Sequence, residues 1–366
     1  MAADVWDVLV IGAGPAGAVA AAALAERGVR VAILEKDLRL EAKPGEVLTP
    51  NAIAILSHLG LLDLIEANDN LACPLACIDR AWSMARPNRE HFLGHLGGRA
   101  WVIDRVALER LLVSRAMRAS VDVFLGHHVR GLSRRHGYWS VQARSSDGLA
   151  SLRASFVVDA SGRAATVARR LGAKRKSLFR LLALHVQSAP DTERQSEPAS
   201  LTIEAAAVGW WYAVCGPRQT LTCALFTDDP VLARSGAARS TLLTALDDTN
   251  SLPRWTKELV RSGRMRSVDA SPSLLGQPAG EGWLAIGDAA ASFDPLASQG
   301  LANALASAVA GAEAIGAYLK GDRVPVEAFA VRTTETWRHS VRQLFPIYQA
   351  AAHRWPTPFW QAHSSA

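Results

Sequence analysis

The feature that most constrains the fold of this chain is a glycine-rich turn between an apolar run and an alanine-rich run. In VLVIGAGPAGAVAAAALAERGVRVAILEK, Gly12, Gly14 and Gly17 follow the spacing G-x-G-x-x-G. In a strand–turn–helix unit the first glycine permits the tight turn, the second lets the backbone approach a pyrophosphate, and the third lets helix and strand pack closely. The next apolar run ends in Glu35, about twenty residues later, where an acid accepts a hydrogen bond from a ribose hydroxyl. The segment therefore predicts a dinucleotide-binding β–α–β unit with an anion at the helix N-terminus.

Two later segments have the same order of strand, turn and helix. WLAIGDAAASFDPLASQGLANAL is an apolar strand that ends in Gly287 and Asp288, and its loop, with Pro295 and Gly300, leads into a helix of small residues. FVVDASGRAATVARRLG is a strand that ends in Asp159 and continues as Ala-Ser-Gly-Arg. The three segments span most of the chain, and a chance α/β sequence would not contain all of them.

These three segments resemble those of the large flavoprotein group that contains p-hydroxybenzoate hydroxylase, the geranylgeranyl reductases and the flavin-dependent halogenases. The resemblance implies FAD as the cofactor, with Asp288 on its ribityl chain and Arg105 near its pyrophosphate or ribose. It also implies that the helix after Pro295 points its N-terminus at the flavin edge that becomes negative on reduction, a charge that the helix dipole stabilises. The residues that we expect to bind FAD are Gly12, Gly14, Pro15, Ala16, Gly17, Glu35, Lys36, Gly45, Arg105, Asp159, Asp288, Pro295, Gly300 and Leu301.

Length and composition fit a globular protein with a large core. The chain has 366 residues, of which 49% are hydrophobic, and its mean hydropathy is +0.08, which allows two or three domains. The N-terminus shows no signal peptide, and the apolar run Leu301–Leu319 contains Asn303 and Glu313, so we expect a buried helix and no membrane span. The four cysteines lack metal-ligand spacing and are expected to be reduced thiols, which favours a cytoplasmic protein.

The charge pattern and the motif content argue against several classes of function. The formal net charge is +6, and the arginines are dispersed apart from a cluster at Arg169–Lys176. No nucleic-acid recognition motif accompanies this cluster, so we interpret it as a solvated helix end and predict no nucleic-acid partner. The chain has no metal ligand set, no catalytic triad and no P-loop, which argues against hydrolysis and phosphoryl transfer.

We predict an α/β fold with a Rossmann-like FAD-binding domain of the glutathione-reductase type, an inserted antiparallel-sheet substrate domain and a C-terminal helix. The FAD-binding domain is discontinuous. The predicted boundaries are 1–75, 104–175 and 275–322 for the FAD-binding domain, 76–103 and 176–274 for the substrate domain, and 323–366 for the C-terminal helix and tail.

Several elements within these boundaries can be predicted from the pattern of apolar and turn residues. Val121–Leu125, Gly131–Arg134 and Trp139–Ala143 are expected to form a small antiparallel meander. LLALHVQSA, SLTIEAAAV, WWYAVC and TLTCALFTD are expected to be consecutive strands, because turn residues separate them. The C-terminal region is expected to be a helix at Val326–Tyr348, followed by an irregular tail at Trp355–Pro358.

The loop KPGEVLTP bears on which chemistry the flavin performs. It resembles the loop that places Gly45 and Glu46 near the flavin in halogenases, and the resemblance implies that a halogenase also needs a lysine downstream of this loop. The chain has no lysine between Lys43 and Lys174, and Gly209–Val214 does not match the tryptophan-halogenase signature WxWxIP. A halogenase is therefore disfavoured.

A smaller branch of halogenase-like monooxygenases resembles the chain more closely. It contains flavoproteins that oxidise a tryptophan of a partner oxidase during maturation of a tryptophylquinone cofactor. Its PGE loop, GWWY strand and DPLxSQG loop correspond to Pro44–Glu46, Gly209–Tyr212 and Asp294–Gly300. The resemblance implies an FAD-dependent monooxygenase that hydroxylates an aromatic ring through a flavin C4a-hydroperoxide.

The same resemblance leaves the substrate and the electron donor open. The substrate is an aromatic small molecule, or a Trp or Tyr side chain of a protein, peptide or carrier-bound intermediate. The electrons come from NAD(P)H directly or through a separate flavin reductase. The alternative functions are a geranylgeranyl-reductase-like double-bond reductase and a flavin-binding partner without turnover of its own.

Candidates for a catalytic role are Glu46, Pro295, His185 and Trp211. Glu46 either orients the ring or acts as a base, or it pairs with a lysine or a helix end. Trp211 points to the opposite face of its strand from its two aromatic neighbours, and the sequence does not decide which face meets the flavin. His185 lies in mid-strand among leucines, where a core histidine is a commoner interpretation than a catalytic one.

Overall fold

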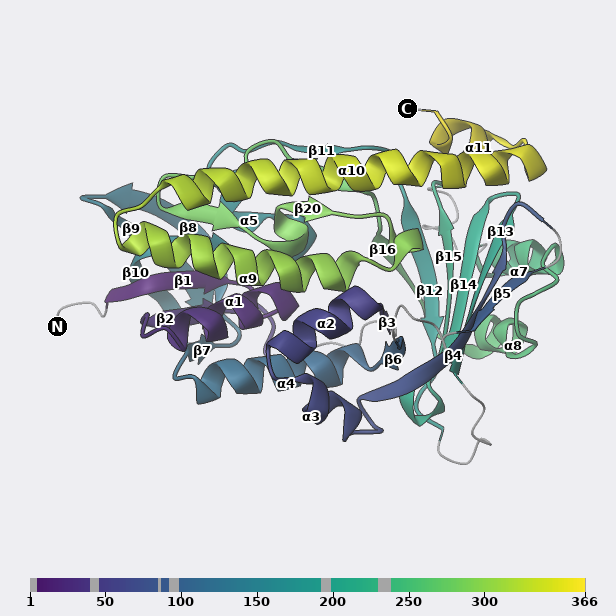
Figure 1. The fold of residues 1–366 in the computed structure, drawn as a ribbon, viewed down its shortest axis with the longest axis horizontal. Coiled ribbons are helices and arrows are strands. Elements are labelled where there is room, and N and C mark those ends of the chain that lie inside the picture. Colours follow the sequence, from purple (N-terminus) through teal and green to yellow (C-terminus); the bar gives the residue numbers. More distant parts are fainter. Residues whose placement is uncertain are drawn as a thin grey trace.

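The computed structural model describes residues 5–39, 46–84, 87–91, 99–191, 199–229 and 238–365. Two sheets lie side by side in the elongated molecule, and a long C-terminal helix, α10, runs along both of them (Figure 1). The N-terminus lies at the left end of this view and the C-terminus at its upper edge, right of centre. The chain is therefore built from two sheet-centred parts that one helix connects.

The first sheet is parallel at its centre and has the order β18-β19-β10-β1-β2-β7. Its strands are Ala279–Gly280, Trp283–Ala285, Gly148–Asp159, Val5–Ile11, Val31–Leu34 and Asp122–Phe124 in that order. Helices cover one face of it, namely α1 (Pro15–Ala25), α4 (Arg105–Arg118) and α9 (Gly300–Leu319). The central strands are continuous apolar runs because both of their faces are buried.

The other face of this sheet is covered by a meander made of β8 (His128–Arg135), β9 (Tyr138–Ser145) and β10. The predicted meander was wrong at its first strand. Asp122–Phe124 forms β7, which pairs in parallel with β2 at the edge of the sheet and does not pair with β8. A short apolar run does not reveal its pairing partner, because the partner is distant in the sequence.

The second sheet has nine strands, in the order β16-β12-β15-β14-β13-β4-β6-β3 with β5 beside β4. The strands in order along the chain are Glu46–Leu48, Ala72–Ala81, Asn88–His91, Trp101–Ile103, Leu182–Gln187, Ala199–Ala206, Gly209–Cys215, Leu221–Thr227 and Met265–Asp269. The sheet is antiparallel as predicted, apart from one parallel pair that β4 forms with β13. One face packs against α7 (Ala238–Asp247) and α8 (Trp255–Ser262), and the other faces the C-terminal helices.

Short elements complete the part of the chain that the structure describes. The helices α2, α3 and α5 are Pro50–His58, Leu62–Glu66 and Thr166–Arg170, and a small sheet contains Arg175–Ser177 (β11), Ser273–Leu275 (β17) and Ala291–Ser292 (β20). Four 3₁₀ turns, η1 to η4, are Gly162–Ala164, Pro217–Gln219, Gly287–Ala289 and Pro295–Ala297. All four cysteines are free thiols.

The C-terminal region is more helical than predicted. Helix α10 runs from Val324 to Arg354, and the expected irregular tail contains a further helix, α11 (Pro358–His363). Pro358 is compatible with the first helical turn, and Phe359 and Trp360 are only 4% and 0% exposed. The tail folds because these two aromatic side chains pack into the core under the second sheet.

Helix α9 has the length and apolar composition of a membrane-spanning helix, with a mean hydropathy of 1.2. In the structure it packs against α1, α2 and α10, and Leu305, Ala308 and Ile315 are fully buried. The contacts are those of a core helix, as expected for the run Leu301–Leu319.

Candidate functional site

The three glycine-containing segments meet at the carboxyl ends of adjacent parallel strands. Ile11 of β1 pairs with Asp159 of β10, which pairs with Ala285 of β19. Backbone hydrogen bonds continue the ladder just beyond the strands, from Ala160 N to Ile11 O at 2.9 Å and from Ile286 N to Asp159 O at 2.9 Å. Ligands of open α/β sheets bind outside these strand ends, so this edge is the candidate site.

The three glycines of the first segment have different surroundings. A Cβ atom at Gly12 would lie 2.3 Å from the carbonyl oxygen of Ala160, and one at Gly17 would lie 2.0 Å from the carbonyl oxygen of Gly12. A Cβ atom at Gly14 would have nothing within 4 Å. Gly12 and Gly17 are therefore needed for the packing of the chain itself, whereas Gly14 leaves open space at the start of α1.

Helix α1 begins at this open space without a side-chain cap. Gly14 is its N-cap, Pro15 is its first residue, and Ala16 and Gly17 follow. The N–H groups of a first helical turn have no partner inside the helix. The N-terminus is thus suited to bind a phosphate group.

Glu35 ends β2 beside this turn. Its carboxylate is 9% exposed and accepts hydrogen bonds from Ala13 N at 2.8 Å and from Asp37 N at 3.1 Å. A carboxylate has about four acceptor positions, so Glu35 can accept further bonds from a ribose. The neighbouring Lys36 points to solvent, with its side chain 66% exposed and its ammonium 3.9 Å from Asp37.

The Asp288 segment lies against the same turn. A Cβ atom at Gly287 would lie 2.9 Å from the Cβ atom of Ala16, and Gly287 has a left-handed φ of +57°. The Asp288 side chain is 40% exposed, and one carboxylate oxygen lies 3.7 Å from Nε of Arg163. Asp288 is therefore accessible at the edge where α1 begins.

The loop that follows leads to a second helix without a side-chain cap at its N-terminus. Asp294 Oδ1 accepts a hydrogen bond from Leu296 N at 2.9 Å and so stabilises the turn η4, which begins at Pro295. Ser298 takes a left-handed φ of 50° and redirects the chain into α9. The first residues of α9 are Gly300, which is half-buried, and Leu301, which is 2% exposed.

Arg105 begins α4, which packs against α1. Its guanidinium donates to Glu109 Oε1 at 3.0 Å, and the Glu109 side chain is completely buried while that of Arg105 is 15% exposed. The buried carboxylate fixes the direction of the guanidinium. Asp104 caps the helix by accepting a hydrogen bond from Ala107 N at 3.0 Å.

Asp159 has a structural partner for each carboxylate oxygen. Oδ1 accepts from the Ser161 hydroxyl at 2.6 Å and from Ser161 N at 3.1 Å, and Oδ2 accepts from Val167 N at 2.8 Å and Ala168 N at 2.9 Å. The residue is 0% exposed. The geometry gives this carboxylate a structural role at the start of α5, and its expected contact with FAD stays a prediction.

Arg175 was missed because we interpreted the basic cluster around it as solvated. Its guanidinium donates to the carbonyl oxygens of Asp288 and Ala289, each at 2.6 Å, and to the hydroxyls of Ser273 at 2.8 Å and Ser292 at 3.3 Å. Burial lowers the pKa of Arg175, and the nearby Asp288 opposes this effect. Arg175 joins β11 to β17, β20 and η3. We did not predict the strand β11, and its three residues hold no signal that singles out Arg175, because the side chains that it contacts lie about a hundred residues further along the chain.

The predicted catalytic residues are not all brought together. Trp211 is 1% exposed and packs with α7 and α8, on the face of the second sheet that turns away from η4. His185 lies on the other face, towards which Leu296 of η4 packs. The backbone of Glu46 forms β3 next to β6, and Gly45 lies outside the described residues.

His185 is buried on this face without a complete set of partners. It is 5% exposed, and its Nδ1 has no hydrogen-bond partner among the described residues. Burial lowers the pKa of His185, and the charge of Arg266 on β16 lowers it further. His185 and Tyr212 both pair with Ala224, one from each side, so the two side chains share a face with only an alanine between them.

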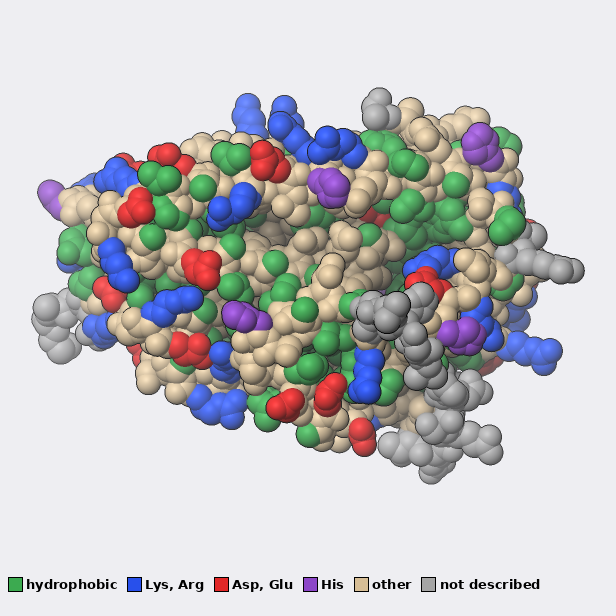
Figure 2. Space-filling model, in the orientation of Figure 1, with side chains coloured by type: hydrophobic (Ala, Val, Ile, Leu, Met, Phe, Trp, Pro, Cys, Tyr) green, Lys and Arg blue, Asp and Glu red, His purple; other side chains and the backbone are tan. Residues whose placement is uncertain are grey.

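The surface around the second sheet is hollowed on one side. Figure 2 shows hydrophobic side chains gathered in a recess over the right half of the molecule, below the end of α10. Charged side chains of both signs are spread over the rest of this face.

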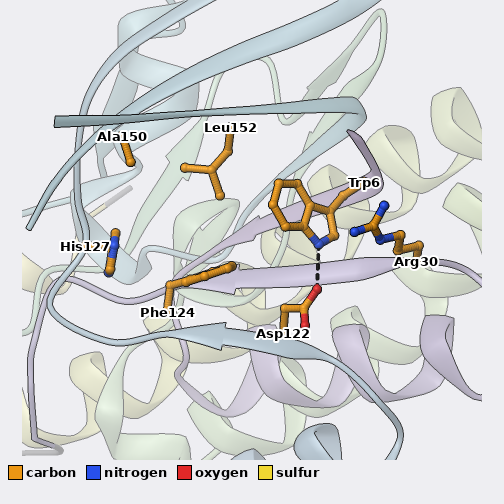
Figure 3. Close-up of a pocket in the computed structure, with 7 residues that line it drawn as sticks. All are labelled: Trp6, Arg30, Asp122, Phe124, His127, Ala150 and Leu152. Atoms are coloured by element: carbon orange, nitrogen blue, oxygen red, sulfur yellow. Dashed lines mark hydrogen bonds between the residues drawn. The ribbon is translucent and has the colours of Figure 1, made fainter. Parts of the chain in front are cut away.

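A separate hollow of about 420 Å³ lies on the other side of the first sheet (Figure 3). Its lining includes Trp6, Arg30 and Asp122, which stand at the amino ends of β1, β2 and β7 and so at the opposite edge from the glycine turns. Trp6 Nε1 donates to Asp122 Oδ2 at 2.7 Å, and the Arg30 guanidinium lies 5.2 Å from the centre of the Trp6 ring. We do not assign this hollow to the candidate site.

The edge formed by the three glycine segments suits FAD. Gly14 leaves open space, the N-termini of α1 and α9 both lie at the same strand ends, and Glu35 stands beside the turn. An extended dinucleotide with a pyrophosphate needs such a cradle. The contacts of individual residues with FAD stay predictions.

Comparisons with known proteins agree with this interpretation. The family model of the FAD binding domain matches residues 5–327. A 1H-pyrrole-2-carbonyl-[peptidyl-carrier protein] chlorinase of Pseudomonas fluorescens is 26% identical and aligns over 87% of this chain and 77% of its own. The putative FAD-dependent oxidoreductase LodB of Marinomonas mediterranea is 23% identical over 97% of this chain and 96% of its own. The digeranylgeranylglycerophospholipid reductase 1 of Methanopyrus kandleri is 27% identical over 96% and 91%.

Solved structures share the fold. The myxobacterial chondrochloren halogenase CndH superposes with a TM-score of 0.86 and 23% identity, covering 99% of this chain and 86% of its own. The peptidyl tryptophan dihydroxylase QhpG superposes with a TM-score of 0.77 and 22% identity, covering 99% and 79%. With a glycine-rich FAD cradle and a family model that matches most of its length, this chain belongs to the FAD binding domain family and is an FAD-dependent oxidoreductase.

Proposed function

We propose that this chain is a monooxygenase that hydroxylates an aromatic substrate between the turn η4 and the second sheet. The observation that carries the proposal is the buried Nδ1 of His185, which has no partner among the described residues and lies on the face that meets η4. A buried nitrogen without a partner costs free energy, which a substrate hydroxyl or indole N–H would recover. His185 is therefore our candidate for orienting the ring.

The surrounding side chains support an aromatic substrate. Ala183 and Ala224 flank His185 on the same face, and Tyr212 lies beyond Ala224. The two alanines are small apolar neighbours of the imidazole, and Tyr212 adds an aromatic ring on the same face. This combination of apolar area with a few polar atoms is typical of a small-molecule or side-chain binding site.

The reaction balances with one O₂ and one external reductant. NAD(P)H and a proton supply two electrons and two protons, directly or through a flavin reductase. One oxygen atom is inserted into an aromatic C–H bond to give C–OH, and the other takes the two electrons and two protons and leaves as water. Bound FAD supplies the oxygen-activating chemistry, while the chain positions the ring and excludes water.

Halogenation is the second candidate, because a chlorinase and a halogenase structure are among the proteins that this chain resembles. The sequence opposes it, since a halogenase of this resemblance needs a lysine in the first half of the chain and none lies between Lys43 and Lys174. Double-bond reduction is a further outcome of the test, because a digeranylgeranylglycerophospholipid reductase is among the similar proteins.

The protein that QhpG acts on suggests which substrates to test first. QhpG is described as a peptidyl tryptophan dihydroxylase, so we propose a Trp or Tyr side chain in a protein, peptide or carrier-bound intermediate as the substrate, with an aromatic small molecule as the alternative. We also propose a cytoplasmic location and a division of labour in which 76–103 and 176–274 bind the substrate.

The test is incubation of the FAD-loaded protein with NADH, a flavin reductase, ¹⁸O₂, and a panel of Trp- and Tyr-containing peptides and free phenols and indoles, in the presence of chloride and bromide. Mass spectrometry should find one or two atoms of ¹⁸O in a product. A halogenated product would replace the proposal by the second candidate. Reduction of an added isoprenoid alkene without oxygen uptake would refute it.

Variants of His185 test the residue on which the proposal rests. His185→Phe should weaken substrate binding, with KM raised about tenfold, because one hydrogen bond to the ring is lost. It should leave FAD binding unchanged. His128→Phe, at an exposed position of β8, is the matched control.

A further inference from the structure

A chain of buried hydrogen bonds connects the turn before α9 with the second sheet. Trp210 Nε1 on β14 donates to the Tyr348 hydroxyl at 3.2 Å, and this hydroxyl donates to Asp294 Oδ2 at 3.0 Å. The other carboxylate oxygen accepts from Leu296 N inside η4. Trp210 and Tyr348 are 0% exposed and Asp294 is 4% exposed, so water does not compete for these bonds.

These hydrogen bonds join three parts of the molecule that are distant in sequence. Asp294 belongs to the loop that leads into α9, Tyr348 to the C-terminal helix α10, and Trp210 to β14, where its ring stacks on Phe226 at 3.9 Å. Tyr212, which lines the proposed substrate space, is two residues from Trp210 on the same face. The direction in which α9 begins is thus tied to the strand that carries this aromatic ring.

The carboxylate of Asp294 is the acceptor for both bonds. Burial raises the pKa of Asp294 from its ordinary value to about 6, although the bonds from Leu296 and Tyr348 and the charges of His363 and Arg163 oppose this. Burial and Asp294 both raise the pKa of Tyr348, so its hydroxyl keeps its proton and donates. The ionised carboxylate accepts both bonds fully, whereas the protonated form turns one oxygen into a donor.

Charged groups face Asp294 from two elements besides its own loop and α10. His363 of α11 lies over the Tyr348 ring with centroids 5.9 Å apart, and its two nitrogens contact the carbonyl oxygens of Phe359 at 2.6 Å and Arg180 at 3.1 Å. Arg163 of η1 is bonded to Ser271 O and lies near Asp288. The Arg163 guanidinium is a cation that favours the charged form of Asp294.

We propose that Tyr348 and Asp294 are positioning residues that hold the turn η4 and the start of α9 in the geometry that binds FAD, and that Trp210 connects this geometry to the substrate-facing strand. The inference does not depend on which reaction the flavin performs. It predicts that FAD affinity is controlled from the C-terminal helix, which is not part of the glycine cradle.

The experiment is a fluorescence titration of the apoprotein with FAD from about pH 8 to about pH 5, in the wild type and three variants. In the wild type, Kd should rise several-fold as the pH falls through the pKa of Asp294, about 6, because protonation weakens the two bonds. Asp294→Asn should show no such inflection. Tyr348→Phe should weaken FAD binding about tenfold at neutral pH and move the inflection to higher pH, because a donor to the carboxylate is lost.

Two further proteins keep the test decisive. Tyr318→Phe removes a hydroxyl from α9, where the ring packs edge-on against Phe156 at 4.9 Å, and should behave as the wild type does. Trp210→Phe keeps an aromatic ring on β14 and should shift the inflection in the same direction as Tyr348→Phe, by less. A wild-type Kd that is constant across this pH range, or a Tyr348→Phe protein with wild-type affinity and inflection, would overturn the proposal. If Tyr348→Phe does not fold, Asp294→Asn and Trp210→Phe decide the matter, and an inflection unchanged from the wild type in both would overturn the proposal.

Discussion

At the scale of single residues, the glycine turn contains positions that the packing of the chain requires and one position, Gly14, that leaves open space. Gly17→Ala would place a methyl group 2.0 Å from the Gly12 carbonyl, so it should unfold the protein or destabilise it by several kcal/mol, on the order of a severe packing clash. Gly14→Ala meets no atom within 4 Å and keeps an ordinary φ of −63°, so the apoprotein should keep its stability within about 0.5 kcal/mol. It should nevertheless bind FAD at least about tenfold more weakly, because the methyl group occupies the space for the pyrophosphate.

Urea unfolding of the apoprotein and FAD titration by fluorescence measure both effects. Wild-type FAD affinity in Gly14→Ala would show that the dinucleotide does not approach the backbone there. The packing roles of Gly12 and Gly17 could be predicted from the sequence, because a glycine requirement depends on local backbone geometry and on the strand before it. The ligand role of Gly14 stays a prediction.

The role of Asp159 could not be predicted in the same way, since its motif suggested a ligand contact while its oxygens bond four donors of its own segment. Asp159→Asn replaces one acceptor oxygen by an NH₂ group that faces two donors. We expect a loss of about 3 kcal/mol in the free energy of unfolding of the apoprotein. Asp147→Asn, in the exposed turn between β9 and β10, should change it by less than about 0.5 kcal/mol. An Asp159→Asn protein with unchanged stability and weaker FAD binding would favour the ligand role.

At the scale of elements, the sequence predicted where several helices and strands form, but it did not predict which strands pair with one another. The helices α1 and α9 and the strands β12 to β15 lie where the sequence placed them, because each is an apolar run bounded by turn residues. β7 was assigned to the wrong sheet region, and β4 pairs in parallel with β13 across a long stretch of chain. Local pattern determines that a strand forms, whereas its neighbours follow from packing over the whole sheet.

A prediction at this scale concerns Arg175, because its guanidinium joins β11 to the turn η3 and to β17 and β20. Arg175→Lys keeps the charge but cannot reach two carbonyls and two hydroxyls in one plane. We expect a loss of about 2 kcal/mol of stability and weaker FAD binding, because η3 carries Asp288. Arg169→Lys, at an exposed position of α5, is the control for the charge and length change. Equal unfolding curves for the two variants would contradict this role.

At the scale of the whole molecule, α10 spans both sheets (Figure 1) and packs on the same face of the second sheet as Leu296 of η4. The sequence predicted the alternation of Trp210, Trp211 and Tyr212 but not the choice of face, because that choice is made by Tyr348 and Trp360 packing from the C-terminal helices. We did not predict this packing, because we expected an irregular tail at Trp355–Pro358 where the chain continues into α11. The glycine turn of the candidate site thus follows from the nearby sequence, whereas the sheet face that lies towards η4 follows from packing against the distant C-terminal helices.

The buried carboxylate of Asp294, which lies where η4 meets α10, makes the stability of the whole protein depend on pH. Burial raises the pKa of Asp294 to about 6 in the folded protein, above its ordinary value of 3.8 in the unfolded chain. Between these values the folded state binds more protons than the unfolded state, so the contribution of Asp294 to stability is present below about pH 4 and is lost as the pH rises through about 6. Relative to Asp294→Asn, the free energy of unfolding of the apoprotein should fall by about 3 kcal/mol across this window, as two pKa units imply. Urea unfolding of both proteins at several pH values measures the difference, in which the other carboxylates cancel. A difference that does not change with pH would mean that Asp294 is not a buried acid at this junction, and a rise with pH would reverse the sign of its contribution.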